Sequence, residues 1–462
     1  RTLVGVLEQA GVAKGMEVLD TLLAVDAGVR ENGHELAHAL GMAAYRSPET
    51  MAASFVACPA TQGAGCHHGV VQGYFLDLMS QGRLPGTPEL DALCEPHRAT
   101  TFLYGQCGHG MGHGLMAVHD NHVPRSLEAC DLAADGYIRE SCYSGIFMEN
   151  IVLVTHPHHT TEGHAAAGGS HGPDALADAH GGHAAGDAHG GHGGAAWKAL
   201  DRDDPLYPCN AVATRYQPAC YVMQTGAILF FNGGDVDATA TACEGAPESM
   251  VPICFGSLGR DAIAFQDQDH RRTLAVCERI ADRAGGRGGE WCMIGVVQNL
   301  VNLAADPAEG MRFCREVGTD AHKRECYRAV GEQSLTLVAN DEQRGASCDG
   351  AEAGFVAACR LGARLAARYR RIIEARGDRG LAPGEIDDDI VRLVAQGELD
   401  ESKAAGTEGD NVFTMVRRIG QAKAGLAADY AAQLQRSVGK VVFFAKHVDV
   451  MDHAEQAFAE RG

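Results

Sequence analysis

Sixteen cysteines arranged in eight close pairs constrain the fold of this chain more than any other feature. The first members are Cys58, Cys94, Cys130, Cys209, Cys243, Cys277, Cys314 and Cys348, at steps of 36, 36, 79, 34, 34, 37 and 34 residues. Their partners, in the same order, are Cys66, Cys107, Cys142, Cys220, Cys254, Cys292, Cys326 and Cys359. A repeat of this length is typical of stacked supersecondary units, so the spacing predicts a repeat protein.

The residues around each pair favour helices. The second cysteine opens an apolar stretch in which apolar residues recur at i, i+3, i+4 and i+7, as in Cys292-Met-Ile-Gly-Val-Val-Gln-Asn-Leu-Val. Glycine often stands three positions after that cysteine, which allows neighbouring helices to approach closely. We therefore expect an all-α fold, an α-solenoid of antiparallel helix pairs in which one disulfide staples each pair.

The cysteine spacing also bears on the cellular compartment. The two cysteines of a pair are 8 to 15 residues apart and no C-x2-C occurs, which does not fit the tight knuckles of structural zinc sites. The favoured interpretation is that the cysteines form eight disulfides in a periplasmic or extracellular protein. The alternative is that they are reduced, buried thiols in a cytosolic protein. Each bridge closes a short loop and contributes about 2–3 kcal/mol.

These helix pairs resemble tetratricopeptide-like repeats, and most of all the secreted, cysteine-rich bacterial versions whose helix pairs carry disulfides. The resemblance is architectural and covers about Cys58 to Arg371. It implies a stack of helical hairpins.

The single step of 79 residues contains an insertion. Residues 156–194 are built mostly of His, Gly, Ala and Asp and include nine histidines between His156 and His192. We expect a disordered loop that collects metal ions, with a neutral linker as the alternative. The predicted organisation is N-terminal repeats with a metal site in 1–155, the loop in 156–194, stapled repeats in 195–375 and a helical cap in 376–462.

Aligning the repeats on the second cysteine of each pair brings histidines into register. His34, His68 and His109 occupy one position in three successive repeats, the first of which has Asn32 where the cysteine would be. His38, Gln72 and His113 occupy the position one helical turn later. Because equivalent helices of neighbouring repeats lie side by side, we expect these histidines to form a ladder across three helices.

This ladder predicts a transition-metal site. Imidazoles suit copper, zinc, nickel and iron, with copper favoured and zinc second because Met42, Met111 and Met116 offer soft ligands nearby. His67, His119 or His122 are candidates to extend the set to two ions. Further candidate ligands or residues that support the ligands are Glu35, Gln72, Met111, Asp120 and Glu149.

Other functions compete with metal capture or delivery. His34-Glu-Leu-Ala-His38 matches the H-E-x-x-H pattern of zinc proteases, but His109-Gly-Met-Gly-His113 has the same spacing without a glutamate. A dinuclear copper or iron enzyme that activates oxygen, non-covalent haem binding, and histidines that only hydrogen-bond between helices are further alternatives. The absence of C-x2-C-H excludes covalent c-type haem attachment.

Net charge and hydropathy restrict the kinds of partner that this chain can bind. The formal net charge of −21 argues against nucleic acid, which requires a basic surface. No apolar run reaches the 18 residues of a transmembrane helix. We expect metal ions as the main ligand, and a protein partner on the solenoid surface or the C-terminal region as the alternative.

Overall fold

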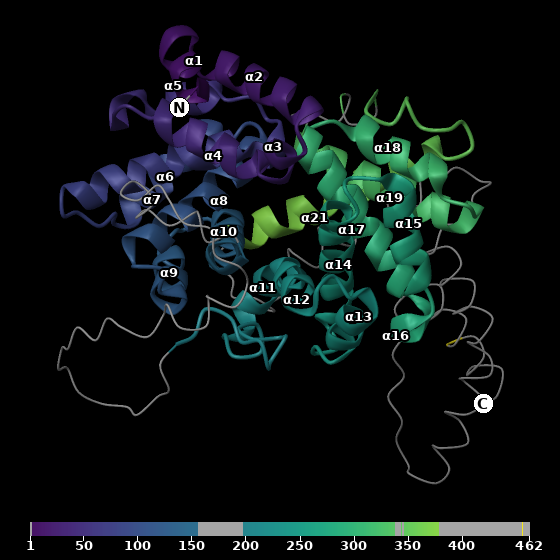
Figure 1. Ribbon diagram of the computed structural model, residues 1–462. Helices are drawn as coiled ribbons and strands as arrows, with labels where there is room; N and C mark the ends of the chain where they lie inside the picture. Colours follow the sequence, from purple (N-terminus) through teal and green to yellow (C-terminus); the bar gives the residue numbers. More distant parts are fainter. Residues whose placement is uncertain (1, 156–196, 338–342, 344–345, 378–454, 456–462) are drawn as a thin grey trace. The chain divides into compact units, whose positions relative to one another are not determined.

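Helices form all the regular secondary structure in residues 2–155, 197–337, 343, 346–377 and 455, which the computed structural model describes (Figure 1). The prediction of an all-α fold is therefore confirmed. The chain divides into two compact units, Arg1–Ile373 and Glu374–Gly462, and the helices that surround the candidate site lie in the first. The histidine-rich segment 156–194 and almost all of 376–462 lie outside the described residues.

The helices before the histidine-rich segment alternate between short and long members. They are α1 (Thr2–Ala10), α2 (Val12–Val25), α3 (Ala27–Glu31), α4 (Gly33–Ala44), α5 (Met51–Ala57), α6 (Gly65–Ser80), α7 (Thr87–Cys94), α8 (Thr101–Val118), α9 (Val123–Cys130) and α10 (Gly136–Thr155). Short 3-10 turns connect them, namely η1 (Pro48–Thr50), η2 (Gln62–Ala64) and η3 (Glu95–His97).

Short and long helices also follow one another after the segment, in a less regular order. The elements are η7 (Thr214–Tyr216), α11 (Gln217–Met223), α12 (Thr225–Asn232), α13 (Val236–Glu244), α14 (Val251–Phe265), α15 (His270–Arg279), α16 (Arg283–Gly286), α17 (Gly288–Ala304), α18 (Pro307–Glu316), α19 (Asp320–Leu337) and α21 (Val356–Gly377).

All eight predicted cysteine pairs lie at disulfide distance, with Cα atoms 5.4 to 5.9 Å apart and no free cysteine. Each bridge ties one helix or loop to the following helix, as Cys94 at the end of α7 is tied to Cys107 within α8. The second cysteine does not always open its helix, since α8 begins at Thr101. Bridges of this number indicate a non-reducing compartment.

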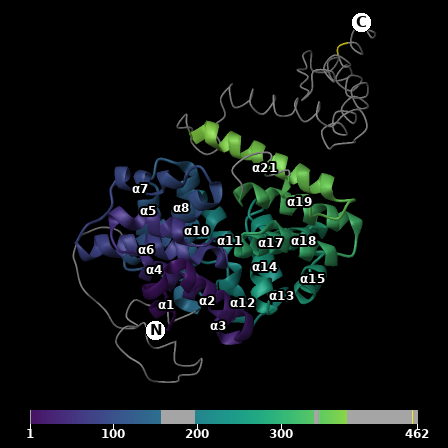
Figure 2. The same ribbon diagram turned by 90° about the horizontal axis from the view of Figure 1, so that it is seen from above.

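The long helices pack against one another in chain order. α4 contacts α6, α6 contacts α8, and α8 contacts α10, and further along α14 contacts α17 and α17 contacts α19. Figure 2 shows α4 and α10 near α6 and α8, and it shows α14 and α19 near α17. Their buried side chains and the disulfides form one continuous core from Leu7 to Cys359.

The stack also folds back on itself. α17 contacts η2 and α19 contacts α8, so later repeats lie against the first ones. A regular, open-ended solenoid therefore stays a prediction. The unstapled first repeat does form, because α2 packs against α4 although Asn32 replaces the cysteine.

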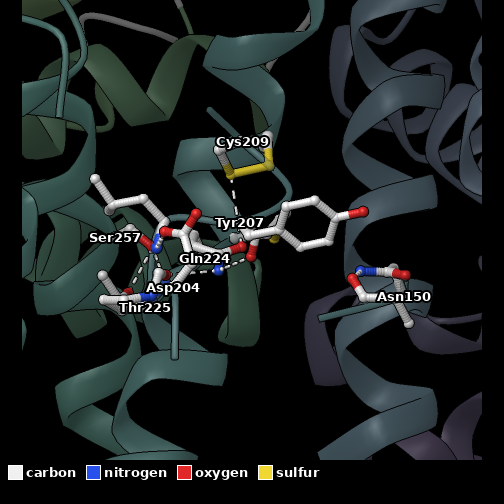
Figure 3. The surroundings of a disulfide bond; sticks show 12 residues. Asn150, Asp204, Tyr207, Cys209, Gln224, Thr225 and Ser257 are labelled. Atoms are coloured by element: carbon white, nitrogen blue, oxygen red, sulfur yellow. Dashed lines mark hydrogen bonds between the residues drawn. A yellow bond between two sulfur atoms is a disulfide. The ribbon is translucent and has the colours of Figure 1, made fainter. Parts of the chain in front are cut away.

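The stapled repeat after the histidine-rich segment is held by a buried amide as well as by its bridge. Gln224 Nε2 donates to the backbone carbonyls of Tyr207 at 2.7 Å and Pro205 at 2.9 Å, beside the bridge that begins at Cys209 (Figure 3). Next to it, Thr225 Oγ1 lies 2.6 Å from Ser257 Oγ on α14. These contacts satisfy polar groups in the core and link the repeat to its successor.

Within the described part of the chain, no helix is both long enough and apolar enough to cross a membrane.

Candidate metal centre

Five histidines from three helices meet in one cluster. α4 provides His34 and His38, α6 provides His68, and α8 provides His109 and His113. The centroids of neighbouring rings lie between 4.6 and 5.6 Å apart. All five positions of the predicted ladder therefore converge, and we call these residues the histidine cluster.

The cluster contains two sets of three histidines whose ring nitrogens lie within 4.8 Å of one another. The first triad is His34, His38 and His68, and the second triad is His68, His109 and His113. His68 belongs to both. Three imidazoles at this separation can hold a metal ion after a contraction of about 1–1.5 Å, because tetrahedral coordination with metal–nitrogen bonds of 2.0–2.1 Å places ligand nitrogens about 3.3 Å apart.

Glycines bring the three helices close enough for these contacts. A Cβ atom on Gly69 of α6 would lie 2.0 Å from the carbonyl oxygen of His38, and one on Gly110 of α8 would lie 3.0 Å from the Cα of His68. Any larger residue at Gly69 would collide with the backbone of α4. The glycine three positions after the second cysteine is therefore what sets the spacing of the histidine ladder.

Two of the predicted supporting residues bind histidines of the cluster directly. Glu149 Oε2 lies 2.6 Å from His113 Nδ1, and Gln72 Oε1 lies 3.1 Å from His38 Nδ1. A carboxylate and an amide oxygen can only accept, so each histidine donates from Nδ1 and keeps its lone pair on Nε2. This arrangement, in which an outer acceptor fixes the ring and its tautomer, is typical of histidine metal ligands.

The other three histidines have supporting residues that the sequence analysis missed. His34 Nδ1 donates to the backbone carbonyl of Gln62 at 2.8 Å, and His68 Nε2 lies 2.6 Å from Gln106 Oε1. His109 Nδ1 lies 2.9 Å from Ser144 Oγ. Ser144 was within reach of sequence analysis, because it stands two residues after Cys142, the register position that His68 and His109 occupy in their repeats.

Two ring nitrogens of the cluster have lone pairs without a donor. His68 Nδ1 and His113 Nε2 are buried and make no hydrogen bond to any described residue. Leaving a buried polar atom unsatisfied costs about 1–3 kcal/mol, and such atoms are rare. Both lie in the second triad, and a metal ion bound there would satisfy them.

Burial and neighbouring rings favour the neutral form of two histidines of the cluster, His68 and His109. Burial, together with the neighbouring histidines, holds the pKa of His68 and that of His109 well below the ordinary value of 6.5. Neutral imidazole is the form that coordinates metals. Protons therefore compete with a metal ion for these rings less than they do for exposed histidines.

His67 does not join the cluster. Its ring lies edge-on to Phe55 with centroids 4.6 Å apart, and His97 stacks on the same phenylalanine at 4.1 Å. Both histidines are buried, and burial is the main cause that lowers the pKa of His67 to about 4. His67 therefore packs into the core beside the cluster.

The remaining candidates take other positions. Met111 and Met116 are fully buried in the hydrophobic core, Glu35 is half-buried on α4, and His122 caps α9 by accepting from the Arg125 backbone amide. A different methionine, Met148 on α10, reaches the cluster, with its Sδ 3.2 Å from His109 Nε2. Met148 also follows from the register, since it stands six residues after Cys142, where His113 stands relative to Cys107.

Comparisons with protein-family models, with curated proteins and with solved structures find no match for this chain. The resemblance to tetratricopeptide-like repeats therefore stays a prediction.

Proposed function

We propose that this protein is an exported metal-binding protein that captures or delivers a transition-metal ion, copper first and zinc second, at the histidine cluster. The observation that carries the proposal is the pair of triads, in which five imidazoles approach within coordination range while their other nitrogens bond to outer acceptors. A structural role for these histidines would call for donors facing the buried lone pairs of His68 and His113, and the described residues supply none.

Copper is favoured over zinc for two reasons. Nitrogen-rich sites bind divalent copper more tightly than other first-row divalent ions, and a thioether beside the rings suits monovalent copper. The histidine-rich segment 156–194 would gather the same ion and raise its local concentration. The disulfides fit a non-reducing compartment, and the periplasm or the extracellular space is the location that we propose.

A redox enzyme with two metal ions is the second candidate. Its support is that the two triads adjoin each other at His68, whose single lone pair, on Nδ1, would serve one of the two ions. The zinc-protease interpretation is less favoured, because His34 and His38 face two further imidazoles, those of His68 and His113, which leaves Glu35 without a special role. Haem is disfavoured because imidazole rings already fill the space between the helices.

The test is elemental analysis of protein in which the nine histidines between His156 and His192 are replaced by Asn, which removes the competing ligands of that segment. We expect this background to retain tightly bound copper after dialysis, and the added pair His109→Ala and His113→Ala to lose it. His322→Ala, which removes an exposed histidine on α19, is the matched control and should retain it. Equal copper in the double variant and the control would refute the proposal.

A further inference from the structure

Met148 makes an unusual contact with His109. Met148 Sδ lies 3.2 Å from His109 Nε2, and the two side chains come from α10 and α8. A thioether carries no proton and is a weak acceptor. Whether this contact is a hydrogen bond therefore depends on which nitrogen of His109 carries the proton.

Ser144 decides the tautomer of His109. Its hydroxyl donates its single proton to the backbone carbonyl of Ser141 at 2.8 Å. Towards His109 Nδ1, at 2.9 Å, the same oxygen can then only accept, so Nδ1 carries the hydrogen. His109 Nε2 is left with a lone pair that faces the sulfur.

Two atoms that both offer lone pairs thus lie in contact, which is unfavourable unless a cation lies between them. The separation fits such a cation. Metal–nitrogen bonds of 2.0–2.1 Å and a metal–sulfur bond of about 2.3 Å place the two ligand atoms about 3.5 Å apart in a tetrahedral site. The observed 3.2 Å is close to this value.

We propose that Met148 is the fourth ligand of the second triad, so that His68, His109, His113 and Met148 form a three-imidazole, one-thioether site selective for monovalent copper. The inference rests on the proposed function and specifies the metal at one of its two triads. The first triad is flanked by oxygen acceptors, namely the backbone carbonyl of Gln62 and the side-chain amide of Gln72. The thioether of Met148 makes the second triad a soft ligand set, which suits monovalent copper.

The register of the repeats supports this assignment. Six residues after the second cysteine stand Gln72, His113 and Met148 in three successive repeats, and six after Asn32 stands His38. Gln72 and His113 each take part in the cluster or its support. Met148 continues the same row on α10, one helix beyond the last histidine.

The test compares Met148→Leu with Met111→Leu in the full chain whose nine histidines between His156 and His192 are replaced by Asn. Leucine keeps the volume and removes the sulfur in both cases, and Met111 is a fully buried core residue. We expect Met148→Leu to weaken monovalent copper binding at least tenfold, measured by competition with a chelator without oxygen, and to change zinc affinity less than twofold. Met111→Leu should leave both affinities unchanged.

X-ray absorption at the copper edge provides the second readout. The parent protein and Met111→Leu should show a sulfur neighbour at about 2.3 Å, and Met148→Leu should show nitrogen neighbours only. Tight copper binding without sulfur in the parent protein would overturn the Met148 assignment and leave the proposed function standing. A parent protein that binds zinc but no copper would overturn the Met148 assignment alone, and one that binds neither metal would overturn both.

Discussion

Glu149 on α10 accepts a hydrogen bond from His113 on α8, with Oε2 2.6 Å from Nδ1 and both side chains buried. The carboxylate fixes the ring so that Nε2 carries the lone pair. It also places a negative charge next to the second triad, which favours a cation there.

Replacing this carboxylate should weaken metal binding. We expect Glu149→Gln to lower copper affinity about 10- to 100-fold, because the amide orients His113 less firmly and adds no charge. Chelator competition measures the change. Glu35→Gln on α4 is the control and should leave the affinity unaltered, whereas a larger loss there than at Glu149 would favour the protease interpretation.

The contact between α8 and α10 should depend on a single glycine. A Cβ on Gly145 would lie 2.0 Å from the carbonyl oxygen of His109, so Gly145→Ala forces the helices apart. We expect a loss of about 1–3 kcal/mol in the free energy of unfolding, together with weaker copper binding as Ser144 and Glu149 move away. Gly5→Ala, which lies inside α1 and meets no atom within 4 Å, should leave copper binding unchanged and should not lower the free energy of unfolding. Chemical denaturation and chelator competition provide the two measurements.

His67 should be dispensable for metal binding. Its neighbours are Phe55 and His97. In His67→Leu the leucine side chain would fill the space of the imidazole against Phe55 and leave the histidine cluster intact. Elemental analysis should give the same copper content as in the parent protein. A loss of copper in this variant, but not in His322→Ala, would place His67 among the ligands after all.

Acid should destabilise the metal-free protein through its buried histidines. Burial lowers the pKa of His67 to about 4, lowers that of His97, and holds those of His68 and His109 well below 6.5. Below pH 6.5 these histidines bind protons in the unfolded chain but stay neutral in the folded chain. The free energy of unfolding is therefore highest above pH 6.5 and falls as the pH decreases.

The urea midpoint of unfolding, measured from pH 8 to pH 4.5, tests this expectation. The midpoint should be constant above pH 7 and fall steadily below pH 6.5. The double variant His67→Leu and His97→Leu should show a shallower fall than His322→Ala. Identical pH profiles would contradict the assignment of these buried neutral rings.

The disulfides should stabilise the fold without contributing ligands. Replacing Cys94 and Cys107 together by Ala should cost about 2–4 kcal/mol of unfolding free energy, because the bridge closes a short loop between α7 and α8. Copper stoichiometry should stay unchanged at low temperature, where the variant is still folded. Alkylation of the unreduced parent protein should label none of its cysteines, and any labelled cysteine would show that a pair is open.

Much of the fold follows from local pattern. The eight cysteine pairs are each close in sequence, so their pairing required no knowledge of tertiary structure, and the apolar periodicity after each second cysteine specified a helix. The register of the repeats placed His34, His38, His68, His109 and His113 on successive helices, because equivalent positions in stacked units lie side by side. The solenoid, the cap and the histidine-rich loop remain predictions.

The tertiary structure decided what sequence periodicity leaves open. Whether His67 or His68 faces the cluster depends on the rotation of α6, and the packing of Phe55 settled it. The contacts of Gln62, Gln106 and Met148 with the histidines depend on distances between helices, which glycine contacts set to within an ångström. The return of α17 to η2 likewise depends on curvature summed over many interfaces. The sequence determined which residues share a row, and only the packing determined which atoms meet.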